Sequence, residues 1–181
     1  MVNKSNLSSL LIIALGAAMI AVLSQIVVPV GTVPFTLQTL GVGLLASLLR
    51  PKEAFGANLL YLGLGAIGLP VFAGGTSGFA TLVGPTAGFL WGFLAYAVVC
   101  SAMVKRNANL LNLILGNLLG TILVYACGIA SLHFLANLTW QQAFLVGALP
   151  FLLSDALKIT LIVLLRQPLL RSLKQTNYFK A

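Results

Sequence analysis

Long apolar segments alternate along the chain with short connections that are charged or rich in glycine and proline. The apolar segments cover residues 7–28, 35–50, 54–73, 82–104, 108–135 and 150–166. Crossing the hydrocarbon of a bilayer takes about 20 apolar residues. The second segment is short and the fifth is long, differences that tilting and packing can absorb. The pattern predicts an all-α integral membrane protein with six transmembrane helices, forming a single transmembrane domain over residues 1–181.

The composition agrees with a membrane protein. Hydrophobic residues make up 60% of the chain and charged residues only 7%, whereas a soluble domain carries about 25% charged residues. The first apolar segment follows Lys4 and has some features of a signal peptide. It is longer than the usual apolar part of such a peptide and five more segments follow, so we expect a helix that is retained.

Lysine and arginine lie in every second connection and at both ends of the chain. The loops 29–34, 70–81 and 136–149 contain none. Lys and Arg accumulate on the cytoplasmic side of membrane proteins, so we expect both termini to be cytoplasmic. The residues that we place on this side are Lys4, Arg50, Lys52, Lys105, Arg106, Arg166, Arg171, Lys174 and Lys180.

The connections on the opposite side are uncharged and rich in glycine and proline, above all residues 29–34 and 70–88. Irregular backbone near membrane depth is tolerated only where protein buries it or where it lines a cavity. These loops therefore predict a pocket that opens outward. They could also be no more than tight turns.

Asp155 and Lys158 are the charged residues that fall well inside a predicted span. Each costs about 2.5–3.5 kcal/mol near the centre of a membrane helix, so each should have a reason to be there. A spacing of three places both on one helix face. Pro150 suits the first turn of that helix, which brings Asp155 close to the outer mouth. The two residues could contact a ligand, or they could form a structural ion pair.

Further polar groups are weaker candidates. Thr36, Gln38 and Thr39 open the second span as a polar cluster that could merely cap a helix, and Thr36 and Gln38 could line the mouth. Gln38 offers both a donor and an acceptor. Tyr125, like the other tyrosines within the spans, could point its hydroxyl inward or serve packing.

Small residues form a stripe on the first helix. They recur with the spacing i, i+3, i+4, i+7, which allows close approach of another helix in lipid. The stripe could serve packing within the chain or docking of a partner. Its members are Ala14, Ala17, Ala18 and Ala21.

Several kinds of chemistry are missing from the sequence. The glycine-rich stretch lacks the Lys-Ser/Thr of a nucleotide-binding P-loop, so we expect no ATP hydrolysis by this chain. Glu53 and Asp155 are its two acidic residues, and it has one histidine. We therefore predict no enzyme activity, no metal site and no cofactor. Cys100 and Cys127 fall at different depths, so we expect no disulfide.

Four motifs follow one another along the chain: Pro34-Phe-Thr-Leu-Gln-Thr39, Gly68-Leu-Pro-Val-Phe-Ala-Gly-Gly75, Leu82-Val-Gly-Pro-Thr86, and Pro150 through Asp155 to Lys158. Together they resemble the BioY family, the biotin-specific substrate-binding subunits of energy-coupling factor (ECF) transporters, over about residues 10–165. The family often has Gly-Gly-Tyr where this chain has Ala87-Gly88-Phe89, and Gly where it has Ser154.

The resemblance implies a six-helix subunit in the plasma membrane of a prokaryote. Such a subunit captures biotin from outside and works with a transmembrane coupling subunit (EcfT-like) and two cytoplasmic ATPases (EcfA-like). The alanine stripe is similar to the docking motif of these subunits. The residues that we expect at the ligand are Phe35, Thr36, Gln38, Gly74, Gly75, Thr86, Tyr125, Asp155 and Lys158.

The chemistry of biotin suits such a site. Its ureido ring offers two N–H donors and one carbonyl, and its tail ends in a carboxylate. A carboxylate, an ammonium and an amide in an apolar pocket would satisfy these groups. One alternative is a subunit of the same kind for another vitamin, such as thiamine or riboflavin. A second is an ion-coupled secondary transporter, which would need an internal repeat or a proton relay that we do not find in the sequence. A third is a membrane-embedded enzyme.

Overall fold

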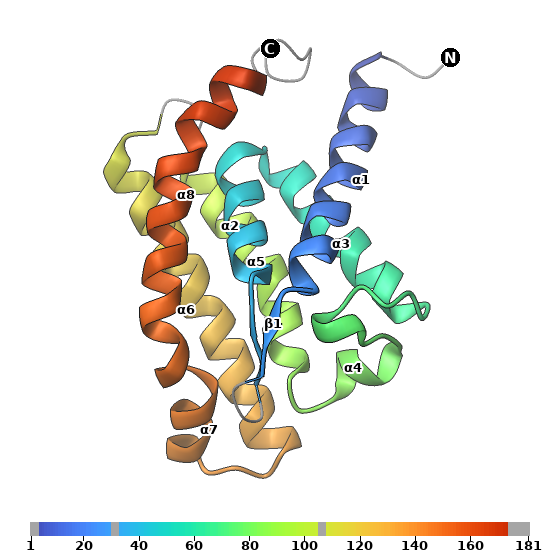
Figure 1. Cartoon of the computed structure of the whole chain (residues 1–181), viewed down its shortest axis with the longest axis vertical. Coiled ribbons are helices and arrows are strands. Elements are labelled where there is room, and N and C mark those ends of the chain that lie inside the picture. Colours follow the sequence, from blue (N-terminus) through green and yellow to red (C-terminus); the bar gives the residue numbers. More distant parts are fainter. Residues whose placement is uncertain (1–3, 30–32, 105–107, 174–181) are drawn as a thin grey trace.

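The structure is a computed structural model that describes residues 4–29, 33–104 and 108–173. The described residues form helices and one short β-hairpin (Figure 1). In chain order the elements are α1 (Lys4–Ser24), β1 (Val27–Val28), β2 (Phe35–Thr36), α2 (Gln38–Leu48), α3 (Pro51–Ala66), the 3₁₀ turn η1 (Ala73–Gly75), α4 (Phe79–Val83), α5 (Ala87–Met103), α6 (Leu110–Leu135), α7 (Trp140–Gly147), the 3₁₀ turn η2 (Leu149–Phe151) and α8 (Leu152–Leu173).

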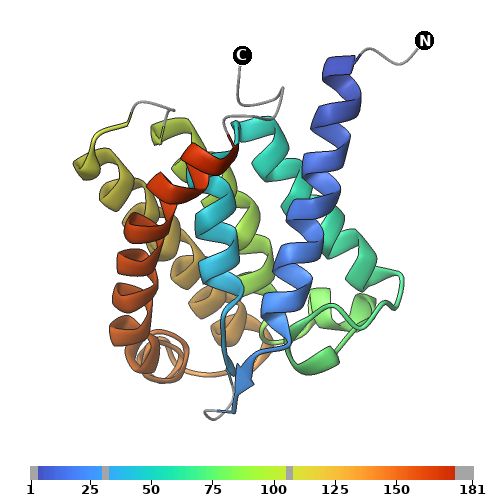
Figure 2. The ribbon, with the colours of Figure 1, turned by 45° about the horizontal axis from the view of Figure 1, so that its top comes forward.

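The six longer helices, α1, α2, α3, α5, α6 and α8, pack side by side as a bundle (Figures 1 and 2). The first turn of α1, the junction of α2 with α3 and the last turn of α8 lie at one end. The short helices α4 and α7 and the β-hairpin lie toward the other end, where Val27 pairs with Thr36 and Val28 with Phe35. The two ends of the bundle therefore differ: one carries the chain ends and the other carries the irregular connections.

Helix α2 lies at the centre of the bundle (Figure 2). Every residue from Leu40 to Ser47 is buried. Close packing at this place requires a residue without a side chain, because a Cβ atom at Gly43 would stand 2.6 Å from the Tyr96 hydroxyl and 2.8 Å from Oδ1 of Asn117. Gly43 thus lets α2 approach α5 and α6 closely enough to bury its whole circumference.

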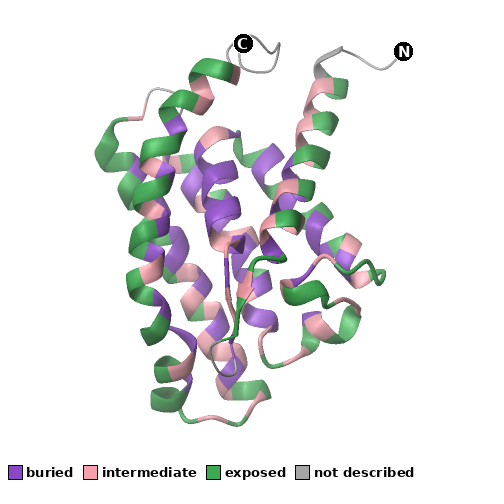
Figure 3. Ribbon diagram, in the orientation of Figure 1, coloured by how far each residue is buried: buried purple, intermediate pink, exposed green. Residues whose placement is uncertain are grey.

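Exposed residues cover the outer faces of the helices (Figure 3), and many of them are large and apolar. Large side chains such as Leu15 on α1 and Leu153 and Leu164 on α8 are exposed by 69%, 76% and 64%. Polar side chains such as Asn58 and Asn117 are fully buried instead. Exposed apolar surface of this extent marks contact with lipid or protein rather than water.

Of the expected spans, 7–28 and 108–135 coincide most closely with single helices, although α1 ends at Ser24 and residues 27–28 form β1. Three helical stretches are long and apolar enough to cross a membrane, namely Asn6–Ser24, Leu110–Leu135 and Trp140–Leu173. Gln38–Leu48 and Ala87–Met103 are shorter apolar helices.

The other expected spans differ in detail. The span 35–50 begins as a strand and becomes helical only at Gln38; the span 54–73 is helical from Pro51 to Ala66; and the span 82–104 is interrupted at Gly84-Pro85. The last span begins at Leu152 rather than Pro150 and continues past Pro168 to Leu173. Proline lacks the backbone N–H that a helix interior needs, which explains the break before α5 and the helix start at Pro51.

This extension of α8 changes the position of Arg166. We expected it in a cytoplasmic connection, but it lies within the helix and is 2% exposed. Its Nε donates a hydrogen bond to the carbonyl of Ser47, at 3.0 Å. Of the other basic residues we placed on that side, Arg50, Lys52 and Arg171 are exposed, and Lys4, Lys105, Arg106, Lys174 and Lys180 lie where the structure describes no side chain. Cys100 and Cys127 are free thiols.

Candidate ligand-binding site

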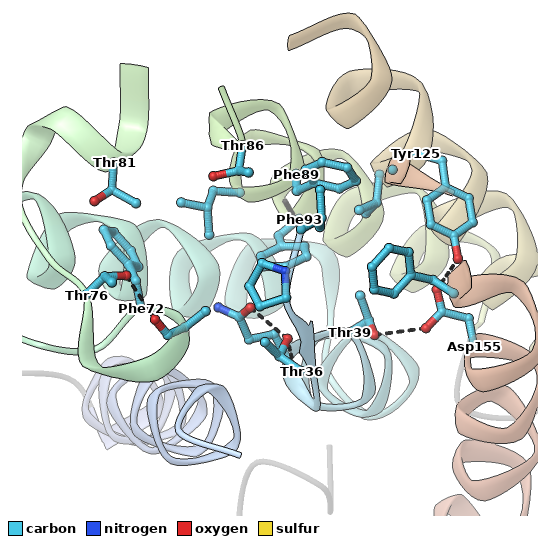
Figure 4. Close-up of a pocket in the computed structure, with 18 of the residues that line it drawn as sticks. Thr36, Thr39, Phe72, Thr76, Thr81, Thr86, Phe89, Phe93, Tyr125 and Asp155 are labelled. Atoms are coloured by element: carbon cyan, nitrogen blue, oxygen red, sulfur yellow. Dashed lines mark hydrogen bonds between the residues drawn. The ribbon is translucent and has the colours of Figure 1, made fainter. Parts of the chain in front are cut away.

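A cavity of about 320 Å³ lies among α2, α5, α6 and α8, toward the end of the bundle that carries the hairpin (Figure 4). This volume is at the lower end of the range for small-molecule sites, about 300–1,000 Å³. The chain segment from η1 to α4 closes one side. The lining residues are Val33, Pro34, Thr36, Gln38, Thr39, Phe72, Ala73, Thr76, Thr81, Thr86, Phe89, Leu90, Phe93, Val124, Tyr125, Gly147, Phe151, Asp155 and Lys158.

One end of the cavity is charged. Lys158 Nζ and Asp155 Oδ1, both from α8, are 2.8 Å apart, and each residue is 6% exposed. They are three positions apart, so the helix holds both on the face that it turns toward α2 and α6. A charged group at this depth is tolerated when it is paired and hydrogen-bonded.

Two hydroxyl groups complete the charged end. Thr39 of α2 accepts a hydrogen bond from Lys158 Nζ at 2.8 Å and donates one to Asp155 Oδ1 at 3.3 Å. Tyr125 of α6 donates to Asp155 Oδ2 at 2.5 Å. Figure 4 shows Thr39 and Tyr125 approaching the carboxylate from two sides. Three helices therefore hold one carboxylate in place.

The ammonium group of Lys158 also contacts an aromatic ring. The Phe35 ring centroid lies 4.6 Å from Nζ, a distance at which the face of the ring attracts a cation. Phe35 belongs to β2, and its ring stacks on that of Phe151 with centroids 6.4 Å apart. The hairpin thus closes over the charged end from the side of the irregular connections.

A second polar group lies farther along the cavity. Gln38 accepts a hydrogen bond from the Thr36 hydroxyl at 2.8 Å and donates one from Nε2 to the Tyr61 hydroxyl at 2.5 Å. Tyr61 in turn meets the ring of Phe72 edge to face. An amide nitrogen carries two hydrogens, and one of them finds no acceptor among the described residues. Gln38 therefore has a fixed orientation and a donor left for a ligand.

The remaining wall is mostly aromatic and hydroxylated. Phe89 and Phe93 stand one helical turn apart on α5, with Thr86 beside Phe89, and Thr81 lies on the side of Phe72 and Thr76 (Figure 4). The cavity thus combines an apolar middle with polar groups at its ends. Among the described residues, no three of His, Cys, Asp and Glu come together as metal ligands.

Most of the predicted site residues meet at this cavity. Thr36, Gln38, Thr86, Tyr125, Asp155 and Lys158 all line it. Phe35 does not line it, but its ring contacts Lys158. The connections that could have been plain turns contribute to the lining instead, through Val33, Pro34, Thr36, Phe72, Ala73 and Thr76.

The expectation for Gly74 and Gly75 needs correction. Both are exposed, and neither lines the cavity; their neighbours Ala73 and Thr76 do so. Their φ angles of 64° and 77° lie in the left-handed region, which glycine adopts without strain. Their role in the structure is to form the turn that presents Phe72 and Thr76.

Sequence reasoning missed several lining residues. Thr39 was considered only as part of a polar helix start, although it bonds both charged groups. Phe89 and Phe93 were not selected, because aromatic residues in an apolar span look the same whether they face lipid or a cavity. Their spacing of four, immediately after the Gly-Pro-Thr motif, was the one available signal.

The alanine stripe of α1 is divided between two environments. Ala17 is 1% exposed and Ala21 is half-buried, and both pack against the core. Ala14 and Ala18 are exposed. The part of the stripe formed by Ala17 and Ala21 therefore serves packing within the chain, which leaves Ala14 and Ala18 on the surface.

Fold and site together define a class of protein. The outside of the bundle is suited to lipid, and the inside holds a cavity of ligand size with a neutral pair of charges at one end. These are the features of a helical membrane protein that binds a small, partly polar molecule. The chain belongs to the BioY family, whose family model matches residues 1–175.

Individual relatives agree with this assignment. The chain is 43% identical over 178 residues to biotin transporter BioY2 of Lactococcus lactis subsp. cremoris, covering 98% of each chain. It is 36% identical over 148 residues to biotin transporter BioY of Thermotoga maritima, covering 82% of this chain and 87% of the other. Its fold matches a crystal structure of the S-component for biotin from an ECF-type ABC transporter. The TM-score is 0.83 and the identity 28%, over 93% of this chain and 94% of that one.

Proposed function

We propose that this chain is the biotin-binding S-component of an ECF-type vitamin uptake transporter. It captures biotin from outside the cell and delivers it inward together with a coupling module. The names of its relatives support this function. The observation that carries it is the cavity in which Asp155, Lys158, Thr39 and Tyr125 form one hydrogen-bonded group beside an aromatic wall.

The unused hydrogen-bonding capacity of this group suits a ureido ring. Lys158 uses two of its three donors, on Asp155 and Thr39. Asp155 Oδ2 accepts from Tyr125 and has a second lone pair. One donor and one acceptor therefore remain side by side. We place the ureido N–H groups at Asp155 and at the Tyr125 oxygen, and either the ureido carbonyl or the tail carboxylate at Lys158.

The rest of the ligand would occupy the apolar middle of the cavity. Phe89 and Phe93 suit the thioether ring and the hydrocarbon tail, since both are apolar. The far end of the ligand meets Gln38 and Thr86. Phe35 closes the mouth over Lys158.

The membrane arrangement that we propose has six spans, α1, α2, α3, α5, α6 and α8, with both termini cytoplasmic. It is supported by the chain ends lying at one end of the bundle and by the exposed Arg50, Lys52 and Arg171. Helix α2 has 11 residues, about 16 Å of helix, which is too short to cross lipid alone. It does not have to span the hydrocarbon by itself, because the other helices surround it and keep it out of contact with lipid.

The coupling module supplies the energy, because this chain contributes binding and no chemistry. We propose that Ala14 and Ala18, on the free face of α1, dock an EcfT-like coupling subunit that joins two EcfA-like ATPases in the plasma membrane of a prokaryote. Small exposed residues let a partner helix approach closely. No cofactor takes part, and biotin is the transported ligand.

Equilibrium binding to the purified chain tests this function. Labelled biotin, thiamine and riboflavin are offered separately, and the preparation is searched by mass spectrometry for ligand retained through purification. We expect tight binding of biotin, and retained biotin, with no measurable binding of the other two. Binding of thiamine or riboflavin in preference to biotin would support the alternative of a subunit for another vitamin.

A further inference from the structure

A second cavity, of about 510 Å³, lies between α6 and α8 on the outside of the bundle. These two helices lie side by side in both views (Figures 1 and 2). Ile114, Leu118 and Ile122 line it from α6, and Ile159 and Val163 line it from α8. We call this cavity the α6–α8 groove. The stretches Leu110–Leu135 and Trp140–Leu173 are long and apolar enough to cross a membrane. Leu118, Ile122 and Leu164 of the lining are exposed by 43%, 50% and 64%, so in the proposed membrane arrangement the groove faces the hydrocarbon.

The polar groups of the groove are engaged within the chain: Asp155, its one charged lining residue, is bonded to Tyr125 and Lys158. Thr121 donates its hydroxyl to the carbonyl of Asn117 at 3.0 Å, and Thr160 donates to that of Ala156 at 2.9 Å. The hydroxyl of Tyr125 is directed to Asp155. Every hydroxyl of the lining therefore donates within the chain, and apart from these hydroxyls and Asp155 the lining side chains are hydrocarbon.

The dimensions of the groove suit an extended hydrocarbon chain. Its lining runs from Leu110 to Tyr125 on α6 and from Leu152 to Leu164 on α8, which corresponds to about 22 Å and about 18 Å of helix. One leaflet of bilayer hydrocarbon is about 15 Å thick. The groove runs along the helices, in the direction that lipid chains take in a bilayer.

A helix from another protein fits the groove less well. Helix association in lipid relies on small residues that allow close approach and on hydrogen bonds between helices. The lining is dominated by leucine, isoleucine and valine instead, and its hydroxyls are already bonded. A flexible acyl chain can follow such a surface without either requirement.

The groove and the ligand cavity share a wall. Tyr125 and Asp155 line both of them. The bond from the Tyr125 hydroxyl to Asp155 Oδ2 therefore forms a partition one side chain thick. An empty groove would leave this partition open to any water that enters from the side, and water would weaken the charge interactions at Asp155.

We propose that the α6–α8 groove binds an acyl chain of a membrane phospholipid, and that this chain forms the outer layer of the wall beside the ligand cavity. This assignment is independent of which ligand the cavity binds. It requires only that α6 and α8 lie in a bilayer.

The test uses the full chain in nanodiscs of phosphatidylcholine, with a small fraction carrying a photoreactive diazirine in one acyl chain. After excess lipid is washed off in detergent, the sample is irradiated, and the attached lipid is counted by mass spectrometry and mapped to peptides. The variant Thr160→Trp fills the groove. The control Leu59→Trp adds the same side chain on α3, where Leu59 is 49% exposed. Thermal stability is measured for all three proteins.

We expect one tightly held lipid in the wild type and in Leu59→Trp, attached within residues 110–125 or 152–164. Thr160→Trp should fold and lose at least about 80% of this attachment. Equal attachment in Thr160→Trp, or no retained lipid in the wild type, would overturn the proposal. A second copy of the chain found in contact with the groove residues, in place of lipid, would also overturn the proposal and assign the groove to an interface between two copies. If Thr160→Trp does not fold, the same measurement is made on Val163→Phe, which fills the groove with a smaller side chain.

Discussion

Thr39 occupies an unusual position for an uncharged residue, because its one hydroxyl contacts both charges of the cavity. It accepts from Lys158 and donates to Asp155, so it fixes the orientation of the pair relative to α2. Tyr125, from α6, donates to Asp155 alone. The ion pair is therefore oriented from both sides, and the remaining donor and acceptor point in directions that the protein sets.

The charged pair can be tested without confusing ligand contact with structural pairing. Removal of one partner leaves a buried charge alone, which costs about 3–5 kcal/mol, so Asp155→Asn and Lys158→Met should each destabilise the protein. The double variant carries no net change of charge. We expect it to fold and to bind biotin at least about a hundredfold more weakly, as two lost polar contacts predict.

The measurements for the charged pair are thermal unfolding and biotin affinity, for the two single variants and the double variant. Lys52→Met serves as control, since Lys52 is exposed and lies in the first turn of α3, at the end of the bundle opposite to the hairpin. Near-native affinity in a well-folded double variant would show that the pair is structural only.

Thr39 itself gives a finer prediction. Thr39→Val keeps the shape and removes the hydroxyl, so Lys158 and Asp155 each lose one hydrogen bond. We expect affinity for biotin to fall about tenfold, the equivalent of about 1.4 kcal/mol. Thr160→Val is the matched control, because that hydroxyl bonds only to its own helix. Equal affinity in the two variants would remove Thr39 from the site.

At the scale of elements, α1 presents two different faces. Ala17 packs inward, and a Cβ atom at the neighbouring Gly16 would stand 2.9 Å from Cβ of Ala57 on α3. Ala14 and Ala18 face outward. The same helix can thus close the core and remain available to a partner.

Tryptophan substitutions should separate the two faces of α1. Ala14→Trp and Ala18→Trp should leave folding and biotin binding intact while reducing uptake in cells that contain the coupling module, because the partner helix loses its close approach. Ala17→Trp should instead lower the thermal stability, because it overfills a packed core. Normal uptake in both outward variants, at wild-type protein levels, would place the partner elsewhere.

The elements also show what the sequence could not provide. The helices α1, α6 and α8 could be predicted because their apolar runs are long. The end of α3 at Ala66 and the break before α5 were missed, since the connection between them is uncharged and hydropathy does not distinguish an apolar loop from a helix. The glycines of this connection were a sign of its irregular backbone. Gly68 and Gly78 adopt φ angles of 101° and 92°, which a helix does not contain.

The site was predictable to a similar degree. Asp155 and Lys158 were evident because a charge inside an apolar span has few explanations. Phe93 and Thr39 were not, since aromatic and hydroxyl groups occur on every face of a membrane helix. Only the packing of α2 against α5, α6 and α8 decides which of them face the cavity.

At the scale of the whole molecule, the proposed orientation can be tested by labelling. Cys100 and Cys127 are first replaced by alanine. Single cysteines are then introduced in place of Lys105, Gly75 and Trp140. A membrane-impermeant reagent applied to intact cells should label the cysteines at 75 and 140 and should label that at 105 only after the cells are opened, because basic loops stay in the cytoplasm. Strong labelling at 105 from outside would reverse the orientation.

The burial of α2 on nearly all sides has a consequence for the way the chain enters the membrane during synthesis. Eleven residues that include two glycines, a glutamine, a threonine and a serine carry too little hydrophobicity to leave the translocation channel for lipid unaided. Helix α3 follows after only two residues, Leu49 and Arg50. The two helices should therefore insert together as one hairpin. In an insertion assay with glycosylation tags, we expect the α2 segment alone to pass through the membrane and the α2–α3 segment to be retained. Helix α3 would then hold α2 in the bilayer until α5, α6 and α8 have been made and surround it.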